Sequence, residues 1–192
     1  QNIYPINMEE CNGYLITGSK LSVYDSEEWI RNLEIYIQKL EREKKPLVGV
    51  CFGHQLIAQA LGGSVEKSDT GWTLGVQNYK FLEQFPALDN QNNSIGLIHS
   101  HQDQVTNLPA EAKLIATSSK VPVAMFSIGD HIMSMQGHPE FTPEYAYDVT
   151  TKRKDQLDQE VYDEASLSLK NDIANNVEVA KWWVKFFQSR HQ

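Results

Sequence analysis

Cysteine, basic residues and long apolar runs are all scarce in this chain. Among its 192 residues only Cys11 and Cys51 are cysteines, too few for a disulfide framework, and we expect two free thiols in a reducing, cytoplasmic compartment. No apolar run approaches the ~20 residues of a membrane-spanning helix and no secretory signal opens the chain, so we expect no membrane partner. The 17 Lys and Arg against 25 Asp and Glu give a net charge of −8, which argues against a nucleic-acid partner.

The composition that remains is typical of a folded domain. Hydrophobic residues make up 41% of the chain and aromatic residues 10%, which is enough apolar surface for a sizeable core. No linker-like segment divides the chain, and its longest polar tract is Asp89–Ser94. The length lies within the ~100–200 residues of most single domains, so we predict one domain over residues 1–192.

The first third of the chain alternates between strand and helix patterns. The apolar run Gly13–Thr17 predicts a strand, and Ser26 is expected to cap a helix that continues until Pro46 ends it. Leu47–Val50 predicts a second strand, and a second helix follows until the pair of glycines at 62 and 63. This order of elements predicts a parallel sheet that is covered by helices.

The middle of the chain changes to short β-like runs, and the last part returns to helix. The runs are Ser64–Glu66, Gly75–Leu82, Ser94–Ile98, Ala112–Ser118, Val123–Ile128 and His131–Met135. A Gly-Asp turn at 129–130 predicts a hairpin between the last two. Pro143 predicts a helix start, and residues 144–190 read as mostly helical. The adjacent Trp182 and Trp183 favour a terminal helix that packs on the sheet, with a docking surface as the alternative.

The segment GVCFGHQ, from Gly49 to Gln55, carries the sharpest chemical signal. It places Cys51 at a tight turn between a buried strand and a helix N-terminus. Such a turn lifts the side chain clear of the sheet, and the helix N-terminus stabilises a thiolate and offers N–H groups to an oxyanion. Glycines at 49 and 53 allow the turn to close. The alternative is that Cys51 is a small buried core residue, the commoner role of a free cysteine.

A thiol nucleophile needs a base, and His138 in the segment GHPE fits that role. Pro139 disfavours the helical region at His138, so the segment should be extended, with residues two apart on one side and ~6.6 Å apart. Glu140 can therefore reach the imidazole, fix its tautomer and support its positive charge. The alternative is a surface histidine beside a loop acid, but the cysteine turn strengthens the catalytic interpretation.

Four motifs in this order resemble those of the class I glutamine amidotransferases, whose glutaminase domain uses a Cys-His-Glu triad. GVCFGHQ is similar to the family's G-x-C-x-G-x-Q pattern, and GHPEF to its H-P-E signature. Thr17-Gly18-Ser19 resembles its oxyanion segment. The run from Ser100 to Asp103 resembles the Ser-His-x-Asp loop of the branch near the GMP synthetase glutaminase domain.

The resemblance implies an α/β fold with an open, mostly parallel, doubly wound sheet of flavodoxin-like type. Helices would cover both faces, and the second half would be small and β-rich. In that family a strand normally precedes the oxyanion strand, so the chain from Gln1 is expected to lack the first strand of the fold.

The resemblance also implies a role for each matching residue. The catalytic residues would be Cys51 as nucleophile, His138 as base and then acid, and Glu140 as its orienting group. The oxyanion hole would come from backbone N–H groups at Gly18 or Ser19 and at Phe52. The substrate would be held by Gly53, Gln55, Ser100, His101, Gln102 and Asp103. No cofactor and no metal are implied, because His99 and His101 lack the further ligands that would complete a metal site.

The sequence is consistent with three alternative functions. The first is a glutaminase that cleaves the side-chain amide of glutamine through a γ-glutamyl thioester and releases ammonia, with any acceptor on a partner synthetase chain. The second is a γ-glutamyl peptide hydrolase with the same triad. The third is a non-catalytic binding protein on the same scaffold, against which the intact triad counts.

Other polar features are interpreted as structural. The basic run Lys152-Arg153-Lys154 is expected to be a solvated patch, since it is short and the chain is acidic. Cys11 is expected to be structural, and His54 to support or pack beside the cysteine rather than to catalyse.

Overall fold

The computed structural model describes residues 3–85 and 94–189, and the predicted polar tract Asp89–Ser94 falls almost wholly outside these ranges. The strands are β1 (Tyr14–Ile16), β2 (Leu47–Val50), β3 (Ser64–Lys67), β4 (Thr73–Phe81), β5 (Ser94–His101), β6 (Asp103–Asn107), β7 (Ala112–Thr117), β8 (Met125–Ile128) and β9 (Ile132–Met135). The α-helices are α1 (Glu28–Arg42), α2 (Phe52–Ala60), α3 (Pro143–Lys152), α4 (Gln159–Asn171) and α5 (Asn176–Gln188), with short 3₁₀ turns at Met8–Glu10 and Lys154–Gln156. No helix in these ranges is long and apolar enough to cross a membrane.

The main sheet has seven strands in the order β1-β2-β9-β8-β7-β4-β5, and β3 pairs with β6 in a separate ribbon. The predicted α/β class is confirmed. Parallel pairing is confined to β1-β2 and β2-β9, and the other four pairings of this sheet are antiparallel. The parallel part is thus narrower than the resemblance implied, because β4 to β9 are linked mostly by turns and hairpins rather than by crossover helices.

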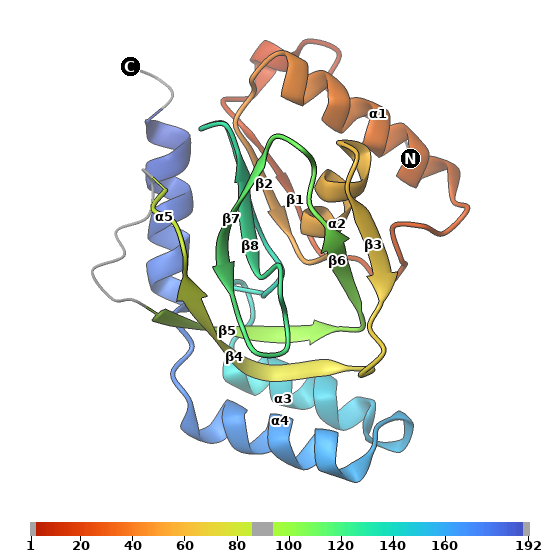
Figure 1. The fold of residues 1–192 in the computed structure, drawn as a ribbon, viewed down its shortest axis with the longest axis vertical. Helices are drawn as coiled ribbons and strands as arrows, with labels where there is room; N and C mark the ends of the chain where they lie inside the picture. The colour runs from red at the N-terminus through yellow and green to blue at the C-terminus, as the bar shows by residue number, and fades with distance from the viewer. Residues whose placement is uncertain (1–2, 86–93, 190–192) are drawn as a thin grey trace.

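Helices cover both faces of the sheet, as expected. Apolar side chains of α1 and α2 form one core cluster with Leu47, Phe126 and Ile132, and the opposite cluster joins α5 to the other face. Figure 1 shows the sheet between α5 on one side and α1 with α2 on the other. Trp182 on α5 is 2% exposed, and Trp183 packs partly buried against the same core, so the predicted packing of the terminal helix is confirmed.

Two local predictions need correction. The N-cap residue of α1 is Glu27 rather than Ser26, and the Glu27 side chain makes no capping hydrogen bond. The predicted loop from Ser100 to Asp103 is instead the end of β5, a bend at Gln102 and the start of β6. β6 contains polar residues such as Gln104 and Thr106, so it lacks the apolar pattern that predicts a strand. It forms a strand because it pairs antiparallel with β3.

The parallel part of the sheet decides where the polar residues meet. The strand order places β1, β2 and β9 side by side and parallel. Gly18, Cys51 and His138 each lie one to three residues beyond the carboxyl end of one of these strands. Because carboxyl ends of parallel neighbours share one edge of a sheet, the three positions converge there, where open α/β sheets bind ligands.

Candidate active site

Cys51 occupies the turn from β2 into α2 as the N-cap of that helix. Its backbone has φ 52° and ψ −104°, an unusual conformation for a residue with a side chain. Such a conformation costs about 1–3 kcal/mol and persists only when the surrounding structure imposes it. The predicted tight turn is confirmed, and it leaves the Cys51 side chain lining two pockets.

Gly49 and Gly53 are the points of closest packing around the turn at Cys51. A Cβ atom added at Gly53 would lie 2.2 Å from the backbone oxygen of Ile16, and one at Gly49 would lie 2.6 Å from the Ile57 side chain. These glycines therefore let α2 pack directly on β1 and β2. Gly53 faces the neighbouring strand and allows the tight turn, and its contact with a substrate stays a prediction.

His138 lies just beyond β9 and is held by three neighbours. Its Nδ1 is 2.7 Å from Glu140 Oε1, and its backbone N–H donates to Ile98 O at 2.7 Å. The Phe141 ring stacks on the imidazole with centroids 4.1 Å apart and planes inclined by 13°. This geometry leaves Nε2 as the ring nitrogen free to exchange a proton with a ligand, since Nδ1 is committed to the carboxylate.

The charge state of His138 follows from opposing effects. Burial lowers the pKa of His138, but interactions with Cys51 and Glu140 outweigh it and raise that pKa from 6.5 to about 9. A protonated imidazole beside a thiol favours the thiolate, which is the nucleophilic form of cysteine. His138 therefore carries its positive charge near neutral pH, directly beside the Cys51 side chain.

Two backbone segments, at Phe52 and at Gly18–Ser19, flank Cys51. Phe52 is the first residue of α2, where N–H groups have no partner within the helix. On the other side, Gly18 and Ser19 line the pocket that also holds His138. A Cβ atom added at Gly18 would lie 3.1 Å from the His138 ring and 3.8 Å from the Cys51 Cβ, so this segment passes directly beside both side chains.

Two pockets adjoin at Cys51. The first, which we call the Gln55 pocket, has a volume of about 310 Å³ and includes Gln55, His101, Gln102 and Asp103 in its lining. The second, the His138 pocket, has a volume of about 380 Å³, and its lining includes His138, Glu140, Phe141, Tyr145 and Val149. Ser19, Lys20, Cys51, Ser100 and Arg153 line both pockets. The thiol is thus accessible from two sides.

The predicted substrate residues other than Gly53 all line the Gln55 pocket. Gln55 Nε2 donates to Asp103 O at 2.7 Å and to Gln136 Oε1 at 3.0 Å. The Asp103 carboxylate accepts from Ser22 Oγ at 2.5 Å and from Tyr24 OH at 2.8 Å. These bonds fix the orientation of a carboxylate and an amide that face the cavity, a pair suited to a ligand that carries an ammonium group.

Arg153 is a pocket residue that the sequence interpretation missed. Its Nη1 donates to Ser100 Oγ at 2.7 Å, and its guanidinium lies 4.8 Å from the centre of the Trp72 ring. The prediction of a solvated basic patch is therefore wrong for Arg153, although Lys152 and Lys154 are exposed. No local pattern marks Arg153, because only the packing of α3 against the end of β5 brings it near Cys51.

Several histidines near the site are buried and neutral. Burial lowers the pKa of His54 and that of His101 to about 3, and it also lowers the pKa of His99. His54 bonds Ser134 Oγ and Val123 O, which fits the predicted packing role. His101 bonds Asp103 O and His99. In residues 3–85 and 94–189 no group of three or more His, Cys, Asp or Glu side chains could hold a metal ion.

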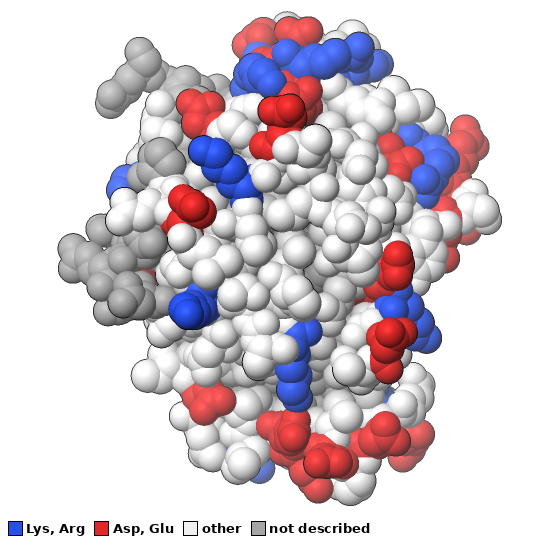
Figure 2. Space-filling model, in the orientation of Figure 1, with Lys and Arg blue, Asp and Glu red and all other residues white. Residues whose placement is uncertain are grey.

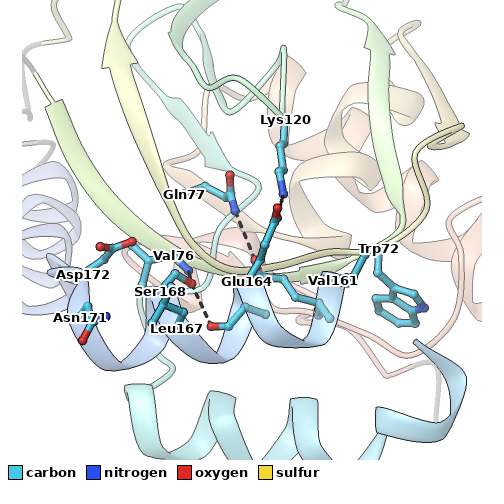
Figure 3. A pocket seen from close by; sticks show the side chains of 12 residues that line it. Trp72, Val76, Gln77, Lys120, Val161, Glu164, Leu167, Ser168, Asn171 and Asp172 are labelled. Atoms are coloured by element: carbon cyan, nitrogen blue, oxygen red, sulfur yellow. Dashed lines mark hydrogen bonds and ion pairs between the residues drawn. The ribbon is translucent and has the colours of Figure 1, made fainter. Parts of the chain in front are cut away.

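A third hollow lies on the outer side of β4, against α4. Its volume is about 310 Å³, and it shares only Trp72 with the Gln55 pocket. Lys120 Nζ and Glu164 Oε2 meet across it at 2.7 Å, and Ser168 Oγ accepts from Val76 N at 3.0 Å (Figure 3). Acidic side chains gather at this end of the molecule (Figure 2). We call this hollow the α4 groove.

An α/β sheet with a cysteine at a strand-to-helix turn and a histidine–carboxylate pair beside it has the architecture of a hydrolase that uses a side-chain nucleophile. A family model for glutamine amidotransferase class-I matches residues 2–153. The chain belongs to this enzyme family.

Known proteins of two kinds are similar in sequence. Gamma-glutamyl peptidase 4 of Arabidopsis thaliana is 36% identical over 148 residues, 74% of this chain and 59% of that protein. Gamma-glutamyl peptidase 3 of the same plant is 32% identical over 171 residues, 85% of this chain and 69% of that protein. A GMP synthase [glutamine-hydrolyzing] of Phocaeicola vulgatus is 31% identical over 140 residues, 72% of this chain and 26% of that protein. The chain thus spans about 59–69% of the two peptidases and about a quarter of the synthase.

Solved structures share the fold. A glutamine amidotransferase from Thermotoga maritima superposes with a TM-score of 0.76 at 20% identity, over 98% of this chain and 81% of that one. A glutamine amido transferase from Methylobacillus flagellatus gives a TM-score of 0.78 at 19% identity, over 98% and 78% of the two chains.

Proposed function

We propose that this protein hydrolyses the amide bond between a γ-glutamyl group and an amino acid or peptide. The observation that carries the proposal is the His138 pocket, which adjoins Cys51 on the side of the proposed acid catalyst. An ammonia leaving group needs no cavity of about 380 Å³, whereas an amino acid or peptide does. The similarity to the two gamma-glutamyl peptidases supports the same substrate class.

The proposed reaction proceeds through a covalent intermediate. The Cys51 thiolate attacks the γ-carbonyl carbon, and backbone N–H groups at Phe52 and at Gly18 or Ser19 stabilise the resulting oxyanion. His138 then donates its proton to the leaving nitrogen, which gives a γ-glutamyl thioester and a free amine.

Water completes the cycle. His138, now neutral, accepts a proton from a water molecule that attacks the thioester, and collapse of this second tetrahedral intermediate releases glutamate and the Cys51 thiolate. Glu140 holds His138 in one tautomer through both steps, because its Oε1 lies 2.7 Å from Nδ1. The γ-glutamyl group would occupy the Gln55 pocket, with its ammonium at Asp103.

A second candidate is glutamine hydrolysis with transfer of ammonia to a partner synthetase chain. The similarity to GMP synthase [glutamine-hydrolyzing] favours it. Glutamine and a γ-glutamyl peptide present the same acyl group to Cys51, so the two candidates differ only in the leaving group.

The test is a labelling and turnover experiment with matched cysteine variants. A glutamine-derived diazoketone should alkylate Cys51 but not the exposed Cys11, as seen by peptide mass spectrometry. Cys51→Ser should lose the adduct and lower kcat by about 10³-fold or more, while Cys11→Ser keeps both. No adduct on a folded protein would overturn the enzymatic proposal and leave a binding protein on this scaffold.

Turnover then separates the two enzymatic candidates. We expect a higher kcat/KM for γ-glutamyl dipeptides, measured by amino-acid release, than for glutamine, measured by ammonia release. A higher kcat/KM for glutamine would replace the first candidate with the second.

A further inference from the structure

Three cationic side chains line the entrance to the Cys51 site. Lys20 and Arg153 line both pockets, and Lys67 lines the Gln55 pocket. Among the described residues no carboxylate lies within 4.0 Å of any of these three cations. The chain as a whole carries a net charge of −8, so this local excess of positive charge indicates an anionic ligand.

Arg153 is the most firmly held of the three. It follows α3, and its position is fixed by Ser100 at the end of β5 and by the face of Trp72 just before β4. A guanidinium has five N–H donors, and the described residues accept from only one of its nitrogen atoms. The remaining donors form a pre-oriented fork, the geometry that binds a carboxylate through two parallel hydrogen bonds.

The position of Arg153 relative to the proposed reaction places its guanidinium within the pocket of the leaving group. His138 delivers its proton to the leaving nitrogen, so the leaving group must lie in the His138 pocket. Arg153 and Lys20 line that pocket as well as the Gln55 pocket, where the γ-glutamyl group would lie, whereas Lys67 lines only the Gln55 pocket. Of the two cations in the His138 pocket, Arg153 is the one whose charged group is held by a hydrogen bond and an aromatic ring. In an amino acid or peptide leaving group, the departing part itself carries a carboxylate.

We propose that Arg153 determines specificity by binding the carboxylate of the leaving amino acid or peptide. This inference rests on the proposed γ-glutamyl hydrolase activity and adds a requirement to it: the part of the substrate that departs must end in a free carboxylate. Ser100 and Trp72 hold the guanidinium in place, and the aromatic side chains of Phe141 and Tyr145 form another wall of the same pocket.

The test compares γ-glutamylglycine with γ-glutamylglycinamide, which differ only in the terminal carboxylate. The wild-type protein should prefer the free carboxylate. In Arg153→Gln the ratio of kcat/KM for the acid to that for the amide should fall by about 10- to 100-fold, as expected for loss of hydrogen bonds to a charged group. Arg153→Lys should restore part of the ratio, because it keeps the charge but loses the fork.

A matched control removes the neighbouring charge. Lys152→Gln, one residue earlier and exposed, should leave the ratio within about twofold of wild type, since exposed charges interact weakly. If the ratio of kcat/KM fell equally in Lys152→Gln, the preference for the acid would come from general electrostatic attraction of the substrate to the protein. This result would overturn the inference.

Two further outcomes would also overturn it. If Arg153 bound the α-carboxylate of the γ-glutamyl group, Arg153→Gln would lower kcat/KM for the acid, the amide and glutamine by the same factor. If Arg153 only supported the fold, the losses would again be uniform and would be accompanied by a lower melting temperature. Failure of the proposed function is distinct from both, because the wild-type protein would then cleave none of these compounds.

Discussion

The Gln55 pocket and the α4 groove have the same volume, about 310 Å³ each, but they are built differently. In the α4 groove the cation and the acid pair with each other, Lys120 with Glu164, and its polar side chain Ser168 bonds the backbone. Around Cys51, by contrast, Lys20, Lys67 and Arg153 have no acid partner among the residues that the structure describes. The comparison teaches that unpaired charge beside a strained nucleophile, rather than the size of a cavity, distinguishes a candidate site.

The largest loss of activity that we expect from this contrast between the two pockets is in a variant of His138. His138→Asn should lower kcat about 10³-fold for every γ-glutamyl substrate, because the variant cannot donate a proton to the leaving nitrogen. The matched change in the groove is Ser168→Ala, which should lower the free energy of unfolding by about 1 kcal/mol through loss of the bond to Val76 N and leave kcat nearly unchanged. A similar loss of kcat in both variants would abolish the distinction between the two regions.

A smaller loss of kcat is expected for a variant of Glu140, together with a change in the pH dependence of the reaction rate. The pKa of His138 is raised from 6.5 to about 9, so activity that needs the imidazolium should decline as pH rises through about 9. Glu140→Gln removes one of the interactions that raise this pKa. The decline should therefore move to lower pH, with kcat at neutral pH lower by on the order of 10²-fold. A pH–rate profile that keeps its upper limb near 9 in the variant would contradict this role of Glu140.

The raised pKa of His138 also predicts how the stability of the fold depends on pH. Because the folded-state pKa lies above the value of about 6.5 for an unperturbed histidine, the imidazolium stabilises the fold fully below that pH, and the contribution is lost as pH rises through about 9. In Glu140→Gln the free energy of unfolding, measured by urea titration, should depend less on pH between these values.

The smallest change in activity and stability is expected for the charged pair of the α4 groove. Lys120 and Glu164 are 50% and 58% exposed, and exposed ion pairs contribute little to stability. Glu164→Gln should change kcat/KM by less than about twofold and the melting temperature by little. A large loss of activity in Glu164→Gln would show that the groove belongs to the working site.

The local chemistry was largely readable from the sequence. The tight turn at Cys51 and the contact between His138 and Glu140 depend on neighbours within two residues in the chain, so short motifs predicted both. The predicted extended course of the backbone from His138 to Glu140 is wrong, because this segment forms a turn in which the Phe141 N–H donates to His138 O at 3.3 Å. Strand β6 was not predicted, because its pairing partner β3 lies about forty residues earlier in the chain. Arg153 was misassigned for a similar reason: its partners Ser100 and Trp72 are remote in sequence.

The sequence by itself determined the family, the α/β class and the residue types that could form a Cys-His-Glu triad, because these depend on short motifs and local backbone preferences. Only the tertiary structure decided that β1, β2 and β9 lie side by side, that Gly53 packs against Ile16, and that Arg153 joins the pockets at Cys51. Strand order and helix packing are set by burial of apolar surface over the whole chain, and no short motif records which distant residues that burial brings together.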